Sequence, residues 1–194
     1  MALETGSARI IVVRHAKAEG YARDDAARRL TDRGVADAAA AGRAVAAALD
    51  ADRLPGSVVA LVSSAARTRQ TWAAVAAVLA DSRPDGADGA ADGAADGEVD
   101  VRVSDDLYEA GVDEVVEMLR LLPPDVTAVI VVGHNPTMAG LLLELSAGTE
   151  SPARSHLAER GMPTASVGVL SAGAGWAELE LGGCRLEEFR PGRE

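Results

Sequence analysis

The sequence predicts an α/β fold, a three-layer α/β/α sandwich built on an open, mostly parallel sheet. Apolar strand-like segments alternate along the chain with helical segments, and this alternation is typical of a sheet with helices on both faces. The clearest strands are continuous β-branched runs, "RIIVV" from Arg9 and "VTAVIVV" from Val126. Such runs lack polar alternation because both faces of the strand are covered. At 194 residues the chain fits one domain, expected to span 1–194.

Each element is predicted from a local pattern. The expected strands are 9–14, 57–64, 99–103, 126–132, 165–170 and 176–181, of which the last two could pair as a hairpin. The expected helices are 32–49, 65–80, 112–122 and 136–147. Thr31 is a predicted N-cap of the first helix, and Ser63 or Ser64 of the second. Pro136 suits the first turn of the last helix and Gly148 its C-terminal end.

Composition and charge narrow the class of protein. The formal net charge of -11 argues against a general nucleic-acid or membrane-surface binder. A single cysteine, Cys184, excludes an internal disulfide and is typical of a reducing compartment. The sequence contains no run long enough to span a bilayer and no apolar leader segment, so we expect a cytoplasmic protein.

The segment at about 81–98 differs from the rest of the chain. It repeats an Ala-Asp-Gly unit, and Gly and Asp disfavour both helix and strand. We therefore expect a disordered Asp/Gly-rich loop within the single domain. A partner-binding acidic segment is the alternative interpretation.

Chemically capable residues follow the strands of the predicted sheet. The first strand is followed by Arg14 and His15, and the second by Ser63, Ser64 and Arg67. The third strand is followed by Asp106, Tyr108 and Glu109, and the fourth by Gly133, His134 and Asn135. In open α/β sheets, ligands bind beyond the carboxyl ends of the strands. The sequence therefore predicts two imidazoles, two guanidiniums and a carboxylate at one edge of the sheet.

This combination of side chains suits phosphoryl transfer. Guanidinium groups bind phosphoryl oxygens bidentately and stay charged at any working pH. A neutral imidazole can attack phosphorus and form a covalent intermediate, and a second imidazole can donate to the transferring oxygens. A carboxylic acid can protonate the leaving oxygen.

The motifs around these residues resemble those of the histidine phosphatase superfamily, also called phosphoglycerate mutase-like. The closest resemblance is to its short SixA-type branch of phosphohistidine phosphatases. In chain order the motifs are "RHAKAEG", "RRLTDRG", "SSAARTRQT", "LYEAG", "VVGHNP" and "MPTASVGVL". The resemblance covers most of the chain, apart from the Asp-Gly repeat and the last residues, and it implies a phosphoglycerate mutase-like fold.

The resemblance also implies roles for individual residues. His15 is the expected phosphorylated nucleophile, and the expected phosphate-binding residues are Arg14, His15, Arg67 and His134. Glu109 falls where many relatives keep a proton donor, with Asp106 as the alternative. Ala16 stands where the usual signature has Gly, a replacement familiar in the short branch.

The expected function is thus a phosphatase that forms a covalent phosphohistidine and removes phosphate from phosphohistidine on a protein. A small-molecule phosphomonoesterase, a mutase of the same superfamily and a non-catalytic phosphate-binding module are the alternatives. No cofactor and no metal are expected, because the sequence shows neither an H-E-x-x-H motif nor a cysteine cluster. A P-loop is also missing from the sequence.

Several other polar residues are interpreted as structural or solvated. His156 lies in a polar stretch, "SPARSHLAERG", that is expected to be a loop. Lys17 and Arg28 are expected at the mouth of the pocket in contact with solvent. Trp72 and Trp176 are expected to pack in or beside the core.

Overall fold

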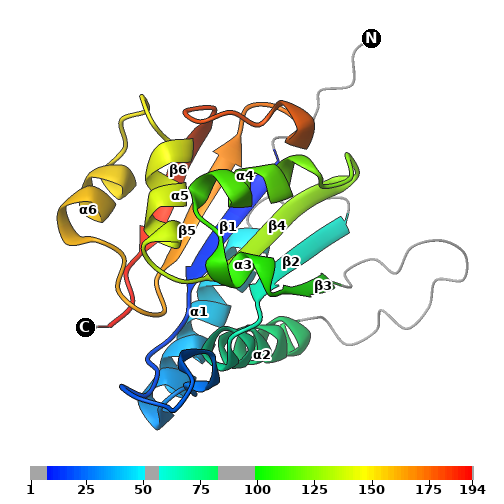
Figure 1. The fold of residues 1–194 in the computed structure, drawn as a ribbon. Helices are drawn as coiled ribbons and strands as arrows, with labels where there is room; N and C mark the ends of the chain where they lie inside the picture. Colours follow the sequence, from blue (N-terminus) through cyan, green and yellow to red (C-terminus); the bar gives the residue numbers. More distant parts are fainter. Residues whose placement is uncertain (1–7, 51–56, 83–98, 194) are drawn as a thin grey trace, which may run out of the picture.

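A computed structural model describes residues 8–50, 57–82 and 99–193 of the chain. In this part of the chain a six-stranded sheet lies between two layers of helices (Figure 1), so the predicted three-layer α/β/α sandwich is confirmed. The strand order is β3-β2-β4-β1-β5-β6. The predicted disordered loop falls mainly on residues 83–98, which lie outside the described residues, while Asp81 is the last residue of a helix.

The centre of the sheet is parallel. Its strands are β1 (Arg9–Arg14), β2 (Ser57–Ser63), β3 (Val99–Ser104), β4 (Val126–Gly133), β5 (Val167–Ala172) and β6 (Cys184–Arg190). Strands β1 to β4 pair in parallel, whereas β5 is antiparallel to both of its neighbours. The carboxyl ends of β1, β2 and β4 therefore meet at one edge of the sheet, which lies toward the bottom of Figure 1.

Two apolar cores hold the helical layers against the sheet. Helices α1 (Asp32–Asp50) and α2 (Ala66–Asp81) cover one face, and α4 (Val112–Arg120), α5 (Thr137–Leu145) and α6 (Pro152–Arg160) cover the other. Strand β1 divides its side chains between these cores. Ile10 and Val12 belong to one, while Ile11 and Val13 belong to the other, and all four are fully buried. Both faces of β1 are covered, as its unbroken apolar sequence predicts.

The last strand differs from the prediction. Residues 176–181 do not form a strand, because Trp176 begins a short 3-10 helix, η2 (Trp176–Glu178). The buried indole of Trp176 donates from Nε1 to the carbonyl of Val126 at 2.8 Å. The partner of β5 is instead β6, in which Cys184 and Leu186 are buried and Arg185 is exposed. The chain therefore does end in an antiparallel hairpin, but its second strand is β6 and not residues 176–181. The burial of Trp176 agrees with its expected packing, as does that of Trp72.

The region around His156 is also different from the prediction. It forms helix α6, not a loop, and the Ser151 hydroxyl caps this helix by accepting from the Arg154 backbone N–H at 3.1 Å. The His156 ring packs edge-on against Phe189, with ring centroids 5.7 Å apart. His156 thus supports the packing of α6 on β6.

Candidate active site

The two predicted histidines meet because β1 and β4 are neighbours. Arg14 pairs with Gly133 in the parallel register, so His15 and His134 leave the sheet side by side. The backbone N–H of His15 donates to the carbonyl of Gly133 at 3.0 Å, and the ring centroids of the two histidines lie 5.2 Å apart. This juxtaposition follows from strand order, since the carboxyl ends of adjacent parallel strands share an edge.

His15 is held as a neutral imidazole. Its Nδ1 lies 2.8 Å from the carbonyl oxygen of Ala16, to which it donates, so Nε2 carries the lone pair. The ring is only 8% exposed, and burial, together with the charges of Arg67 and Arg14, lowers the pKa of His15 to about 4. The Ala16 N–H donates to Thr71 Oγ1 at 3.0 Å, which fixes the turn after β1. His15 therefore presents an unprotonated nitrogen near neutral pH.

His134 is oriented by a residue at the end of β2. The hydroxyl of Ser63 lies 2.8 Å from His134 Nε2, and Ser63 is fully buried. When Ser63 donates this hydrogen bond, the proton of His134 is on Nδ1. Burial and the charge of Arg67 lower the pKa of His134 to about 3. Tyr108 packs edge-on against the ring, with centroids 5.3 Å apart.

The two expected guanidiniums are both part of this site. Arg14 Nη1 donates to the carbonyl of Met162 at 2.6 Å, and Asn135 Nδ2 donates to the same oxygen at 3.0 Å. Arg67 is 4% exposed and lies in the first turn of α2. It donates from Nη1 and Nη2 to the backbone oxygen and the carboxylate of Asp25, at 2.7 and 3.0 Å.

Several buried polar atoms of these residues have no hydrogen-bond partner. Among the described residues, such atoms are Arg14 Nε, Arg67 Nε, His134 Nδ1, Asn135 Oδ1 and, elsewhere, Arg154 Nε. Buried polar groups are nearly always paired, so a group of them in one place is suited to bind a ligand, an ion or ordered water. Three of the four atoms at the site are nitrogens on Arg14, Arg67 and His134, suited to donate to an anion. The four predicted phosphate-binding residues thus lie together, and Arg14, Arg67 and His134 each keep a ring or guanidinium nitrogen without a partner.

Both expected proton donors, Glu109 and Asp106, are exposed on one short helix. Glu109 is the last residue of α3 (Asp106–Glu109) and is exposed, and within the described part of the chain its side chain makes no hydrogen bond or ion pair. Asp106, the alternative, is exposed at the start of the same short helix. Among the described residues, no contact distinguishes the two carboxyls.

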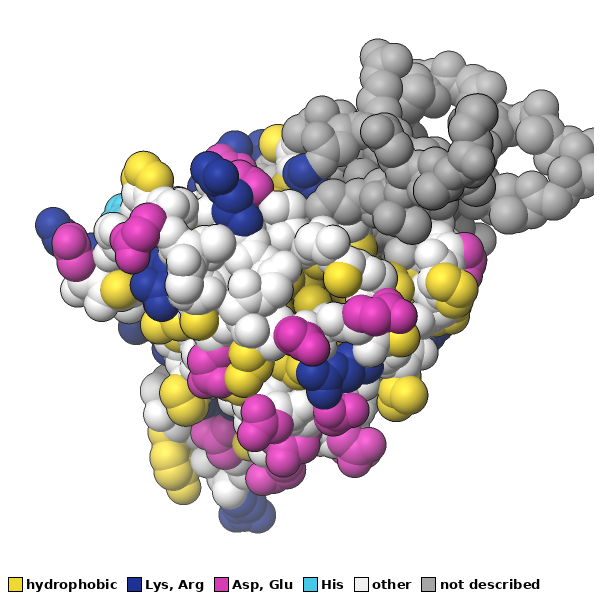
Figure 2. Space-filling view, turned by 90° about the horizontal axis from the view of Figure 1, so that it is seen from above, with side chains coloured by type: hydrophobic (Ala, Val, Ile, Leu, Met, Phe, Trp, Pro, Cys, Tyr) yellow, Lys and Arg dark blue, Asp and Glu magenta, His cyan; other side chains and the backbone are white. Residues whose placement is uncertain are grey.

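The described residues contain no group of three or more His, Cys, Asp or Glu side chains arranged to hold a metal ion. No described helix is both long and apolar enough to cross a bilayer. Viewed from the end at which β1 begins, acidic side chains are interspersed with basic and hydrophobic ones, and this face has no continuous basic surface (Figure 2).

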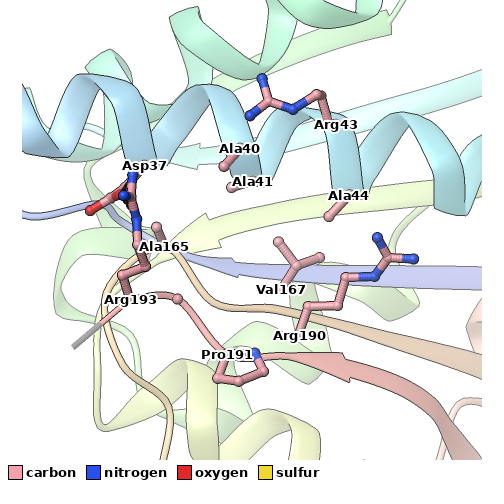
Figure 3. Close-up of a pocket in the computed structure, with 11 residues that line it drawn as sticks. Asp37, Ala40, Ala41, Arg43, Ala44, Ala165, Val167, Arg190, Pro191 and Arg193 are labelled. Carbon is pink, nitrogen blue, oxygen red and sulfur yellow. Dashed lines mark hydrogen bonds and ion pairs between the residues drawn. The ribbon is translucent and has the colours of Figure 1, made fainter.

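A groove also lies on the side of the sheet that α1 covers. This groove of about 280 Å³ runs between α1 and the residues that follow β6, with Arg43, Arg190 and Arg193 among the residues that line it (Figure 3). Asp37 and Arg193 form an ion pair across it at 2.7 Å. Its alanine-lined wall carries no nucleophile, so the groove is not the reactive centre.

Comparison with known proteins gives the site its context. No family model matches the sequence. An uncharacterized protein of Mycobacterium tuberculosis strain H37Rv is 31% identical over 182 residues, which cover 91% of this chain and 98% of that protein. Among solved structures, a protein assigned as phosphohistidine phosphatase SixA of Nakamurella multipartitia is 32% identical with a TM-score of 0.73, covering 97% of this chain and 98% of that one.

The chain belongs to the histidine phosphatase superfamily, in its SixA-type branch. A second protein assigned as SixA, from Agrobacterium tumefaciens, is 26% identical with a TM-score of 0.65, over 94% of this chain and 97% of that one. The phosphoglycerate mutase-like fold expected from the sequence is confirmed. Because both of these solved relatives are assigned as phosphatases, membership indicates a hydrolase that acts on a phosphorylated substrate.

Two features of this SixA-type site were not found by sequence reasoning. Ser63 or Ser64 was expected to cap α2, but the N-cap is Ala65, and the Ser63 hydroxyl orients His134. Asp25, which anchors Arg67, lies in the polar loop after β1, and no local pattern distinguishes it from the adjacent Asp24. Arg28 was expected in solvent but donates to Asp25 at 2.8 Å, whereas Lys17 is exposed as expected.

Proposed function

We propose that this protein is a phosphatase that removes phosphate from phosphohistidine on a protein, through a covalent intermediate on His15. The observation that supports this most directly is the state of His15. Its Nδ1 is engaged by the Ala16 carbonyl, its Nε2 is free, and its pKa of about 4 keeps it unprotonated. A neutral imidazole that lies beside two guanidiniums and a second imidazole is suited to attack a phosphoryl group.

The proposed reaction has two steps. In the first, the lone pair of His15 Nε2 forms a bond to phosphorus, while the bond from phosphorus to the substrate nitrogen breaks and its electron pair stays on that nitrogen. In the second, water attacks the phosphorus of phospho-His15, the phosphorus–nitrogen bond breaks, and inorganic phosphate and neutral His15 are released. In both steps Arg14, Arg67 and His134 would hold the phosphoryl oxygens, on which charge is concentrated at the transition state.

A protein substrate is favoured over a small one by two considerations. The solved relatives assigned as SixA are phosphohistidine phosphatases in name, and this chain matches the first of them over 98% of its length. The sequence also lacks a long insertion next to the site motifs that would form a cap over a small molecule. For this reason a mutase, which must exclude water from its phosphorylated form, is less well supported.

A labelling experiment tests the intermediate. Brief exposure of the protein to a radiolabelled phosphohistidine peptide should leave acid-labile label on the wild type and none on His15→Ala. His156→Ala is the matched control, because it removes the histidine of α6 and should label like the wild type. Label that persists on His15→Ala would contradict the proposed nucleophile.

The same proteins identify the substrate when turnover of phosphohistidine peptides is compared with turnover of small phosphate esters. A higher kcat/KM for the phosphohistidine peptide supports the proposal. A preference for small esters would favour the phosphomonoesterase alternative, and binding of phosphate without turnover of either class would favour a non-catalytic module.

A further inference from the structure

A carboxylate on the loop that follows β1 contacts Arg67 of the site. Asp25 belongs to the short 3-10 helix η1 (Asp25–Ala27), and its side chain is 55% exposed. Its Oδ2 accepts from the Tyr108 hydroxyl at 2.9 Å and from Arg67 Nη2 at 3.0 Å, while its Oδ1 accepts from Arg28 Nε at 2.8 Å. One carboxylate thus contacts a residue of the predicted phosphate pocket and is still open to solvent.

The loop holds Asp25 in this place through contacts of its own. The Leu30 N–H donates to Gln70 Oε1 on α2 at 2.8 Å, and Ala18 and Leu30 form an antiparallel bridge. Arg28 Nη1 donates to the Glu19 carbonyl at 3.0 Å. The Asp24 carboxylate caps η1 by accepting from the Ala26 N–H at 3.1 Å. The position of Asp25 is therefore fixed by both ends of the loop and by α2.

Arg67 keeps unused N–H groups after it has bonded to Asp25. The guanidinium uses one N–H of Nη1 and one of Nη2 for Asp25, while its buried Nε has no partner. Since every N–H of a guanidinium can donate, Arg67 can bind phosphoryl oxygens and Asp25 at the same time. With substrate bound, the Asp25 carboxylate would then remain next to the phosphoryl group, at the exposed side of the pocket.

We propose that Asp25 is a specificity-determining residue, whose carboxylate binds the positively charged leaving group of a phosphoramidate, the imidazolium of phosphohistidine. The proposal rests on the proposed function and names the residue that selects its substrate class. The phosphorylated ring carries a proton on the nitrogen that is not bonded to phosphorus, and the N–H there can donate to Asp25. When the bond to phosphorus breaks, its electron pair stays on the leaving nitrogen, and the product departs as neutral imidazole with that proton in place.

The same carboxylate disfavours phosphate esters. An ester leaving group is uncharged in the substrate and gains negative charge as its bond to phosphorus breaks, so a neighbouring anion raises the barrier. Hydrogen bonds from Tyr108 and Arg28, with the charge of Arg67, lower the pKa of Asp25 to about 2. Asp25 is therefore ionised near neutral pH and cannot serve there as the proton donor that an ester needs.

The test compares Asp25→Asn with the wild type on one peptide that carries either phosphohistidine or phosphoserine, and on nitrophenyl phosphate. Asp105→Asn is the matched control, because Asp105 is an exposed carboxylate near Tyr108 in the sequence whose side chain does not cap its helix. For Asp25→Asn we expect kcat/KM on the phosphohistidine peptide to fall at least about tenfold, the order of effect of a charge-assisted hydrogen bond. The two esters should be unchanged or faster, and Asp25→Glu should recover part of the loss.

Inhibition by vanadate separates recognition of the leaving group from support of Arg67. An unchanged inhibition constant for vanadate together with the selective loss supports the proposal. An equal change on all three substrates, a parallel change in vanadate inhibition, or no change at all would overturn it while leaving the proposed function intact. If the wild type hydrolyses nitrophenyl phosphate but not the phosphohistidine peptide, both the proposed substrate and the role of Asp25 are wrong.

Discussion

The Ser63 hydroxyl lies 2.8 Å from Nε2 of His134, at the ends of the adjacent strands β2 and β4. When Ser63 donates in this contact, the proton of His134 is on Nδ1. Because Nδ1 is buried without a partner, a proton on Nδ1 gives His134 a donor for the phosphoryl oxygens.

We expect Ser63→Ala to lower kcat about tenfold, because His134 loses the hydrogen bond that orients its ring. Ser64→Ala is the matched control, since Ser64 is only partly buried and its side chain makes no hydrogen bond among the described residues. Equal kcat values for the two variants would show that the Ser63 contact does not act on His134. Circular dichroism checks that both variants are folded.

The pKa values of the histidines predict a pH dependence. Those of His15 and His134 lie at about 4 and about 3, below the ordinary value of 6.5, chiefly because both rings are buried. NMR titration of the ring protons should therefore find both rings neutral at pH 5.5, with resonances assigned from His15→Gln and His134→Gln. A transition near pH 6.5 for His15 would contradict the lowered pKa of this ring.

The same shifts affect stability. As the pH falls, the unfolded chain takes up protons on these rings near pH 6.5, before the folded protein does so near pH 4 on His15 and near pH 3 on His134. The contribution of these two rings to the free energy of unfolding should thus be complete above pH 6.5 and be lost between pH 6.5 and about 3. Urea unfolding at several pH values measures this slope, which His15→Gln should reduce.

Arg67→Ala should lower kcat/KM by roughly two to four powers of ten, by analogy with the loss of an oxyanion donor. Vanadate should also bind more weakly, because it imitates the phosphoryl transition state. Arg69→Ala is the control, since Arg69 is exposed on the same helix. Near-normal catalytic efficiency of Arg67→Ala would place Arg67 outside the site.

Glu109→Gln tests the predicted proton donor. The variant keeps the size of the side chain but cannot supply a proton, so alkyl phosphates should be slowed by about two powers of ten or more, and nitrophenyl phosphate least. Phosphohistidine should be comparatively insensitive. Equal losses on all three leaving groups would indicate a supporting role for Glu109 and move the acid role to Asp106 or to no side chain.

The C-terminal residues should stabilise the fold through Asp37. This carboxylate is 3% exposed and accepts from Arg193 and from Arg33, at 2.7 and 3.3 Å. Arg193→Ala should lower the free energy of unfolding by about 1 kcal/mol, since Arg193 itself is largely exposed. Arg43→Ala, on the same groove, is the control and should change it less (Figure 3). Equal unfolding midpoints in urea would contradict a stabilising ion pair.

The sequence by itself determined the sheet and the place of the site. Continuous β-branched runs are recognisable without tertiary information because strands covered on both faces need them. Because β1 and β4 are parallel, Arg14, His15 and His134 lie at the same edge of the sheet. Sequence reasoning was wrong about residues 176–181, because burial of Trp176 against the Val126 carbonyl is a long-range contact that no local pattern reveals.

Only the tertiary structure decided the hydrogen-bond partners and the pKa values of these residues. The contacts of Ser63 with His134 and of Asp25 with Arg67 join segments far apart in the chain, and a serine or an aspartate in a polar stretch looks the same with or without them. The neutral state of His15 likewise depends on its burial and on the guanidiniums around it. Local sequence sets backbone conformation, whereas hydrogen-bond partners and pKa values depend on which strands become neighbours.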